Sequence, residues 1–187
     1  MRMQLPRCLA LVFVVSTIAI GSHARAAAGS FQEDWLGQLG SVEKKLMSLE
    51  EATPPNKMSW RPDKGIRSFS EVYLHAAYGN YGFLKSMGFD PPADAGFGAD
   101  AGKWDKQTVD KEQIKKIMEK SFEHVRATVK ALSDADVDKK VKMFGKFEMT
   151  ERAALLMLLG HLNEHMGQLV AYARMNKIVP PWSKTGA

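Results

Sequence analysis

The 187-residue sequence contains a single cysteine, Cys8, and it has no convincing run of alternating β-branched residues that would predict a β-sheet. One cysteine cannot form an internal disulfide. The sequence also lacks a cluster of lysine and arginine residues of the kind that follows phosphate groups, which argues against a nucleic-acid partner. Its apolar run near the N-terminus, residues 8–20, covers 13 residues, whereas a membrane-spanning helix needs about 20.

The first 26 residues instead have the pattern of a secretory signal peptide. Arg2 and Arg7 give a positive start, the apolar run follows, and the Ala-Arg-Ala sequence at 24–26 provides a cleavage site between small residues. We expect export to the periplasm or the exterior, no stable membrane anchor after cleavage, and one domain at residues 27–187. Cleavage would remove three arginines and lower the formal net charge from +5 to +2. It would also remove Cys8, so any metal site in the mature chain must use histidine and oxygen ligands.

Apolar residues recur every three or four positions in four long segments, which predicts four amphipathic helices. The expected helices cover residues 31–51, 68–87, 109–132 and 150–176. Residues 68–71, Ser-Phe-Ser-Glu, form a capping-box pattern at the second, and Thr150 can cap the fourth. We expect an all-α four-helix bundle, because such helices bury their apolar faces most simply against one another. The connection 88–107 is too long for a tight hairpin and could cross the bundle and cover one end.

Three histidines are candidates for one metal site. His161 and His165 lie one helical turn apart, with His165 within the apolar face of its helix and His161 at the edge of that face. His75 lies at the border of the apolar face of the second helix. Imidazoles on adjacent turns and facing helices can reach one ion, and three imidazoles plus water make an open, catalytic type of site. Histidines at such positions also commonly only pack, so the spacing alone leaves a purely structural role open.

Other residues with metal-site or protease patterns are interpreted differently. His23 leaves with the signal peptide, and His124 is expected to be solvated on the charged side of the third helix. Residues 161–165 fit the H-x-x-E-H motif of inverted zinc proteases, but only 22 residues follow His165 and none of them is acidic, so the downstream glutamate ligand is missing. Glu164 is expected to be a surface charge. The large apolar residues interpreted as packing residues are Trp60, Trp182, Met118, Met157 and Met166.

Three stretches resemble the DinB family of bacterial metal-binding four-helix bundles. They are residues 60–62 (Trp-Arg-Pro), residues 65–75 up to His75, and residues 161–174 followed by Pro180-Pro181. The resemblance spans about residues 31–182. It implies that His75, His161 and His165 bind a divalent metal ion, zinc or nickel, in an up-down-down-up bundle whose long connection joins the second and third helices. It also implies that the chain could form a homodimer.

Two classes of function are compatible with these features. The first is a metal-dependent hydrolase or a group transferase acting on an unknown small molecule; some relatives use the metal to activate a low-molecular-weight thiol. The alternative is a non-catalytic metal-binding or ligand-binding module of the envelope. An enzyme needs an exchangeable position on the metal, and no fourth ligand is evident in the sequence. The sequence does not identify a general base, although several polar residues lie near the ligands: Glu71, Tyr73, Tyr78, Asn163 and Gln168.

Overall fold

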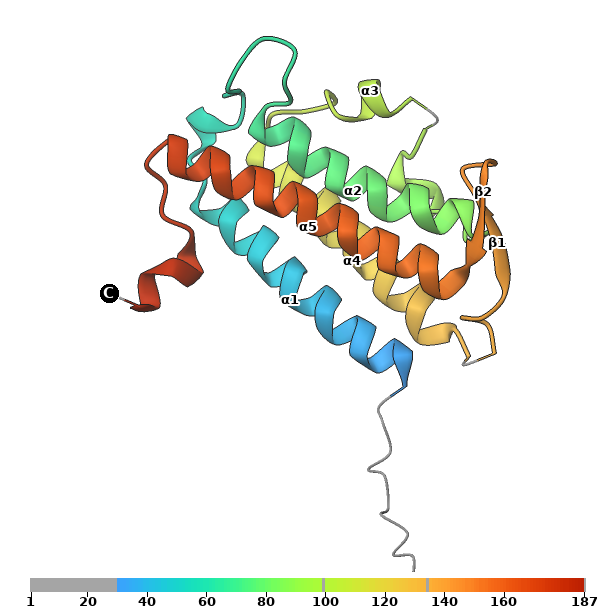
Figure 1. Ribbon diagram of the computed structural model, residues 1–187. Helices are drawn as coiled ribbons and strands as arrows, with labels where there is room; N and C mark the ends of the chain where they lie inside the picture. Colours follow the sequence, from blue (N-terminus) through green and yellow to red (C-terminus); the bar gives the residue numbers. More distant parts are fainter. Residues whose placement is uncertain (1–29, 99, 134, 187) are drawn as a thin grey trace, which may run out of the picture.

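The computed structural model describes residues 30–98, 100–133 and 135–186, so the expected signal peptide lies outside the described residues. Four long helices make up most of the fold (Figure 1): α1 (Phe31–Ala52), α2 (Phe69–Ser86), α4 (Lys111–Ala131) and α5 (Glu151–Met175). The shorter elements are α3 (Ala101–Trp104), the 3-10 turns η1 (Pro55–Lys57), η2 (Ala93–Ala95) and η3 (Pro181–Gly186), and the strands β1 (Lys140–Met143) and β2 (Phe147–Thr150). Within the described part of the chain, no helix combines the length and apolar character needed to cross a membrane.

Side-chain caps define where the long helices begin. The Ser68 hydroxyl accepts a hydrogen bond from the Glu71 backbone N–H, and the Glu71 carboxylate accepts one from the Ser68 N–H. Thr150 accepts from the N–H of Ala153 at the start of α5. Both predicted caps are therefore confirmed, because each satisfies backbone donors that the first helical turn leaves unpaired. A further capping box, at Ser30, begins α1.

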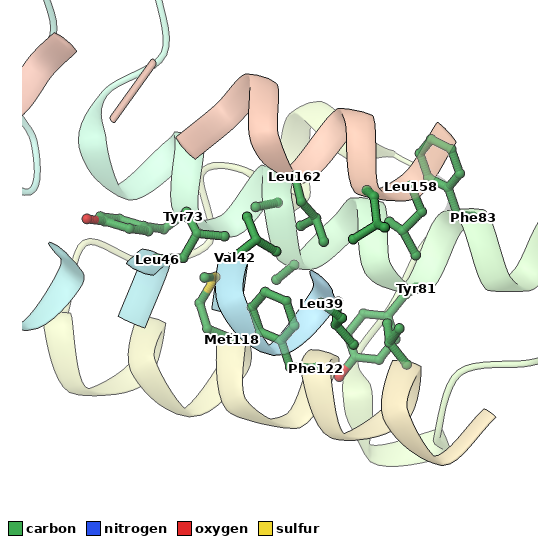
Figure 2. Packing of buried hydrophobic residues seen from close by; sticks show 14 of the residues in the cluster. Leu39, Val42, Leu46, Tyr73, Tyr81, Phe83, Met118, Phe122, Leu158 and Leu162 are labelled. Carbon is green, nitrogen blue, oxygen red and sulfur yellow. The ribbon is translucent and has the colours of Figure 1, made fainter. Parts of the chain in front are cut away.

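The apolar faces of the four long helices meet in one core. α2 packs against α4 and α5, and α1 packs against the same two helices. Figure 2 shows side chains of α1 directed toward those of α4 and α5. The labelled members from these three helices are Leu39, Val42, Leu46, Met118, Phe122, Leu158 and Leu162, all essentially inaccessible to solvent. The predicted helical class is confirmed.

A two-stranded antiparallel hairpin, β1 with β2, was not predicted. The strands are four residues each, and their register pairs Lys140 with Thr150 and Met143 with Phe147. Only Met143 is buried, so the pattern is too short and too exposed to stand out from a loop. The hairpin places the Phe144 ring 5.2 Å from the Phe83 ring near the end of α2.

The long connection between α2 and α4 packs along α2 (Figure 1). Trp104 of α3 is buried and its indole N–H donates a hydrogen bond to the carbonyl oxygen of Leu74, with an N–O distance of 2.9 Å. This anchor fixes Asp105, the next residue, against the side of α2 from which His75 projects.

Two sequence-based expectations about single side chains were wrong. His124 is half-buried, its Nε2 atom has no hydrogen-bond partner, and its ring lies 5.6 Å from that of Tyr81, because the connection and α2 cover this part of α4. Burial lowers the pKa of His124. Met157 is 43% exposed and therefore does not pack in the core. The packing interpretation is confirmed for Trp60, Met118, Met166 and Trp182.

Candidate metal centre

The three candidate histidines converge at one point between α2 and α5. His75 comes from α2, and His161 and His165 come from adjacent turns of α5. One ring nitrogen of each lies within 4.8 Å of those of the other two. The ring centroids are 4.4 Å apart for His161 and His165, 4.9 Å for His75 and His165, and 5.3 Å for His75 and His161. Small rotations of these side chains would bring all three nitrogens within reach of one ion.

His75 is oriented by a carboxylate from the connection. Its Nδ1 atom lies 3.2 Å from an oxygen of Asp105, and Asp105 also accepts a hydrogen bond of 2.8 Å from the Nε atom of Arg67. Burial alone would raise the pKa of Asp105, but the hydrogen bonds from His75 and Arg67 outweigh burial and hold that pKa below its ordinary value. The ionised carboxylate can only accept, so Nδ1 of His75 carries the hydrogen and Nε2 is the nitrogen left for a metal.

His165 is oriented through a side-chain amide. Its Nδ1 atom lies 3.1 Å from Oε1 of Gln168, and the Gln168 amide donates to the hydroxyl of Tyr172, which in turn donates to the carbonyl oxygen of Arg67. This series of hydrogen bonds places the hydrogen on Nδ1 of His165 and again leaves Nε2 free for a metal. Burial lowers the pKa of His165 despite the bond to Gln168, so the imidazole is neutral at neutral pH.

His161 is half-buried, whereas His165 is buried. Burial, followed by the nearby His165 and His75, lowers its pKa to about 4. Its Nε2 atom is buried and has no hydrogen-bond partner. A buried nitrogen without a partner costs roughly 1–3 kcal/mol, and coordination of a metal ion by the ring is one way to satisfy such a group. A neutral imidazole is also the form that binds metals.

Gly79 makes room for His161. A Cβ atom at position 79 would lie 2.3 Å from Nε2 of His161 and 2.5 Å from its Cδ2 atom, distances that real Cβ atoms do not show. The ring therefore rests directly on the backbone of α2, one turn after His75. The sequence showed a glycine in a helix but gave no indication that it faces this histidine.

Only two of the five polar residues near the ligands in sequence contact the cluster. Gln168 bonds His165, and the Tyr78 ring stacks on that of His75 with centroids 6.4 Å apart. Glu164 is exposed, as predicted. The remaining three of the five polar residues have structural roles. Glu71 pairs with Arg61, and Tyr73 lies near the hydroxyl of Thr53. Asn163 donates a hydrogen bond to the carbonyl oxygen of Leu159.

The donor set fits a metal ion such as zinc or nickel. Imidazole nitrogens suit both ions, and hydrogen bonds from Nδ1 to a carboxylate or an amide are the usual supports of metal-binding histidines. Among the residues that the structure describes, no fourth histidine, cysteine, aspartate or glutamate joins the group. A metal ion held by the three histidines would therefore keep a position for water or a substrate atom.

The chain is mostly helical, and two of its helices place three histidines close together. These two features define its structural class. The chain belongs to the DinB superfamily, whose family model matches residues 38–169. A solved structure, a DinB-like protein from Bacillus cereus, is similar with a TM-score of 0.56 and 18% sequence identity, over 81% of this chain and 93% of that chain. Because the sequence identity is so low, this structural similarity shows only that the two proteins share a fold. A search of curated proteins found no match. The resemblance inferred from the motifs is thus confirmed.

Proposed function

We propose that the protein binds one divalent metal ion, zinc or nickel, through His75, His161 and His165 and uses it as a hydrolase or group transferase for a small molecule. The observation that carries this proposal is the orientation of the three imidazoles. Asp105 and Gln168 leave the Nε2 atoms of two rings free, and the third ring has a buried nitrogen without a partner.

In such a centre, the metal ion and the surrounding protein residues would have different roles. A bound ion would lower the pKa of a water molecule or a thiol, or would polarise a substrate oxygen. Asp105 would hold His75 in position and offset part of the positive charge, with Arg67 fixing the carboxylate in turn. Burial, followed by the charges of Asp105 and Asp100, raises the pKa of Tyr78, so its hydroxyl stays protonated at neutral pH.

Three further expectations belong to this proposal. Export of a mature domain, residues 27–187, is supported by the signal-peptide pattern of residues 1–26. The up-down-down-up bundle is supported by the colour gradients in Figure 1, along which α2 and α4 run in one direction and α1 and α5 in the other. A homodimer rests on the family resemblance and stays a prediction.

Cobalt(II) substitution tests whether the centre is open. Cobalt bound by three imidazoles and water has visible absorption bands that change when an added ligand enters the coordination sphere. We expect acetohydroxamate or a small thiol to shift these bands saturably, and the His75→Ala variant to lose the bands. A cobalt spectrum that no added ligand alters would indicate a closed centre, and the alternative of a non-catalytic envelope module would then replace the enzyme.

A further inference from the structure

A cleft of about 440 Å³ lies along α2, and its lining includes Tyr78, whose ring stacks on that of His75. Gly79, on which His161 rests, and Gly82, at the floor of the cleft, are three residues apart and so lie on the same face of the helix. The other lining residues that matter here are Tyr78, Lys85, Phe97 and Phe144. The volume is within the range of small-molecule binding sites.

Aromatic rings connect the walls of this cleft to the histidines. The Tyr78 ring stacks on His75 and also on Phe97, whose centroid is 4.8 Å away. On the other side, the ring of Phe83 lies 5.4 Å from His161 and 5.2 Å from Phe144. Of the rings that line the cleft, Tyr78 therefore contacts His75 directly, and Phe144 is connected to His161 through Phe83.

Phe144 is held at the cleft in a conformation that its residue type disfavours. It has φ 51° and is followed by Gly145 with φ 67°, in a tight turn where the Lys146 N–H donates to the Met143 carbonyl. Hairpin turns with two positive φ values prefer asparagine followed by glycine, and a bulky residue in the first position is strained. The ring is 45% exposed, so burial does not account for the choice. Strain of this kind is typical of ligand-binding positions.

Gly82 keeps the floor of the cleft open. A Cβ atom there would only meet Tyr78 at 3.8 Å and Phe97 at 3.9 Å, which are ordinary contacts. Neither the packing nor the backbone of α2 therefore requires a glycine, although glycine disfavours the helix. A larger side chain would project into the cleft that Gly82 lines.

Lys85 gives the far end of the cleft a positive charge. Its ammonium lies 5.9 Å from the centroid of the Phe97 ring. Its partner Asp90 is 3.5 Å away, and both side chains are largely exposed, so the pair is weak and can give way to another anion.

We propose that this cleft binds the non-reacting part of the substrate, a planar aromatic group that carries a carboxylate or sulfonate. The aromatic group lies among Tyr78, Phe97 and Phe144, and its anion faces Lys85. The reacting end of the same molecule points toward the histidine cluster, and this assignment rests on the function proposed above. Aromatic stacking and the charge of Lys85 together set the specificity.

Calorimetry with three related probes tests this assignment on the mature protein, with and without zinc. The probes are 2-naphthoate, the neutral 2-naphthalenemethanol and the cationic 2-naphthylmethylammonium ion. We expect 2-naphthoate to bind at least tenfold more tightly than the other two, and Lys85→Gln to remove this preference. Gly82→Leu should weaken binding of 2-naphthoate at least tenfold, because the leucine fills the floor.

The Phe144→Asn variant separates binding from folding. Asparagine suits the positive φ at this position, so the melting temperature should stay the same or rise while binding of 2-naphthoate falls at least tenfold. Phe147→Thr is the matched control, since Phe147 is an exposed hairpin residue outside the cleft lining, and binding should not change.

Equal binding of the three probes, or full binding by Gly82→Leu, would overturn the proposal. The two proposals can also fail separately. Zinc uptake without binding of 2-naphthoate would defeat the cleft assignment and leave the metal-dependent function standing. Selective binding of 2-naphthoate by a protein that takes up no metal would support the cleft and defeat the proposed function.

Discussion

At the residue scale, Asp105 and Gln168 each accept a hydrogen bond from the Nδ1 atom of a histidine and so determine which ring nitrogen faces the centre. Gln168 lies three residues after His165 on one helix, a spacing visible in the sequence. Asp105 lies 30 residues from His75, in a connection whose path depends on the burial of Trp104. The three histidines could therefore be identified as candidates from helix faces, and the family resemblance made them a predicted metal site. The carboxylate behind His75 could not be predicted.

The Asp105→Asn variant tests the carboxylate. Asparagine keeps the volume but removes the negative charge, so His75 loses its charged acceptor, and we expect zinc affinity to fall about 10–100-fold with the fold intact. Competition with a chromogenic chelator measures the affinity, and circular dichroism monitors the fold. Asp94→Asn, an exposed site on the same connection, is the control. An unchanged affinity in Asp105→Asn would remove Asp105 from the account of the centre.

The Gly79→Ala variant tests the close approach of His161 to α2. The added methyl group would collide with the imidazole, so we expect the ring to move away and the affinity for zinc to fall at least tenfold although all three histidines remain. The control is Gly37→Ala on the exposed face of α1, where a Cβ atom meets nothing within 4 Å. This control should bind zinc normally and gain up to about 1 kcal/mol of stability from helix propensity. Normal zinc binding by Gly79→Ala would contradict the placement of His161.

Glu50 should make the stability of the protein depend on pH. It is fully buried, its carboxylate oxygens have no hydrogen-bond partner, and burial raises its pKa from 4.5 to about 7. The folded state thus holds a proton more tightly than the unfolded state, and this contribution to stability is complete below pH 4.5 and is lost as the pH rises through 7.

Urea unfolding of Glu50→Gln at pH 4.5 and pH 8 measures this contribution. Glutamine cannot titrate, so relative to wild type the variant should gain about 3 kcal/mol between the two pH values. The exposed neighbour Glu51 provides the control variant, Glu51→Gln. A stability difference between Glu50→Gln and wild type that is the same at both pH values would show that Glu50 is not desolvated.

At the scale of elements, the helices could be predicted closely and the hairpin could not. Apolar periodicity and caps placed all four long helices within two residues of their observed ends, because these signals are local. The hairpin strands contain only four residues each, and Lys-Val-Lys-Met has too few apolar positions to reveal which face is buried. Its turn matters for the cleft because it places Phe144 against Phe83.

Thr150 joins two elements, since it ends β2 and caps α5. Its Oγ1 atom accepts from the Ala153 N–H, and it pairs with Lys140 across the hairpin. We expect Thr150→Ala to lower the free energy of unfolding by about 1 kcal/mol, as the loss of a helix cap usually does. Thr150→Ser keeps the capping oxygen and should retain most of the stability. Equal losses in the two variants, measured by urea unfolding, would show that the methyl group and not the cap contributes.

At the scale of the whole molecule, the fold brings residues from α2, the following connection and α5 to one place. The core formed by α1, α2, α4 and α5 follows from their amphipathic faces, and this much could be predicted. Which side of α2 the connection covers depends on tertiary contacts such as the Trp104 anchor, so neither Asp105 nor the cleft beyond Gly82 could be placed from the sequence. Membership of the DinB superfamily agrees with this helical architecture.

The most direct test of the account is the metal content of the domain at residues 27–187. Plasma mass spectrometry after incubation with zinc or nickel and gel filtration should find about one ion per chain. The His161→Ala/His165→Ala double variant should contain none, and His124→Ala, which changes a histidine outside the cluster, should match wild type. No stoichiometric metal in the wild-type protein, or full metal content in the double variant, would contradict the assignment of a metal centre to these three histidines.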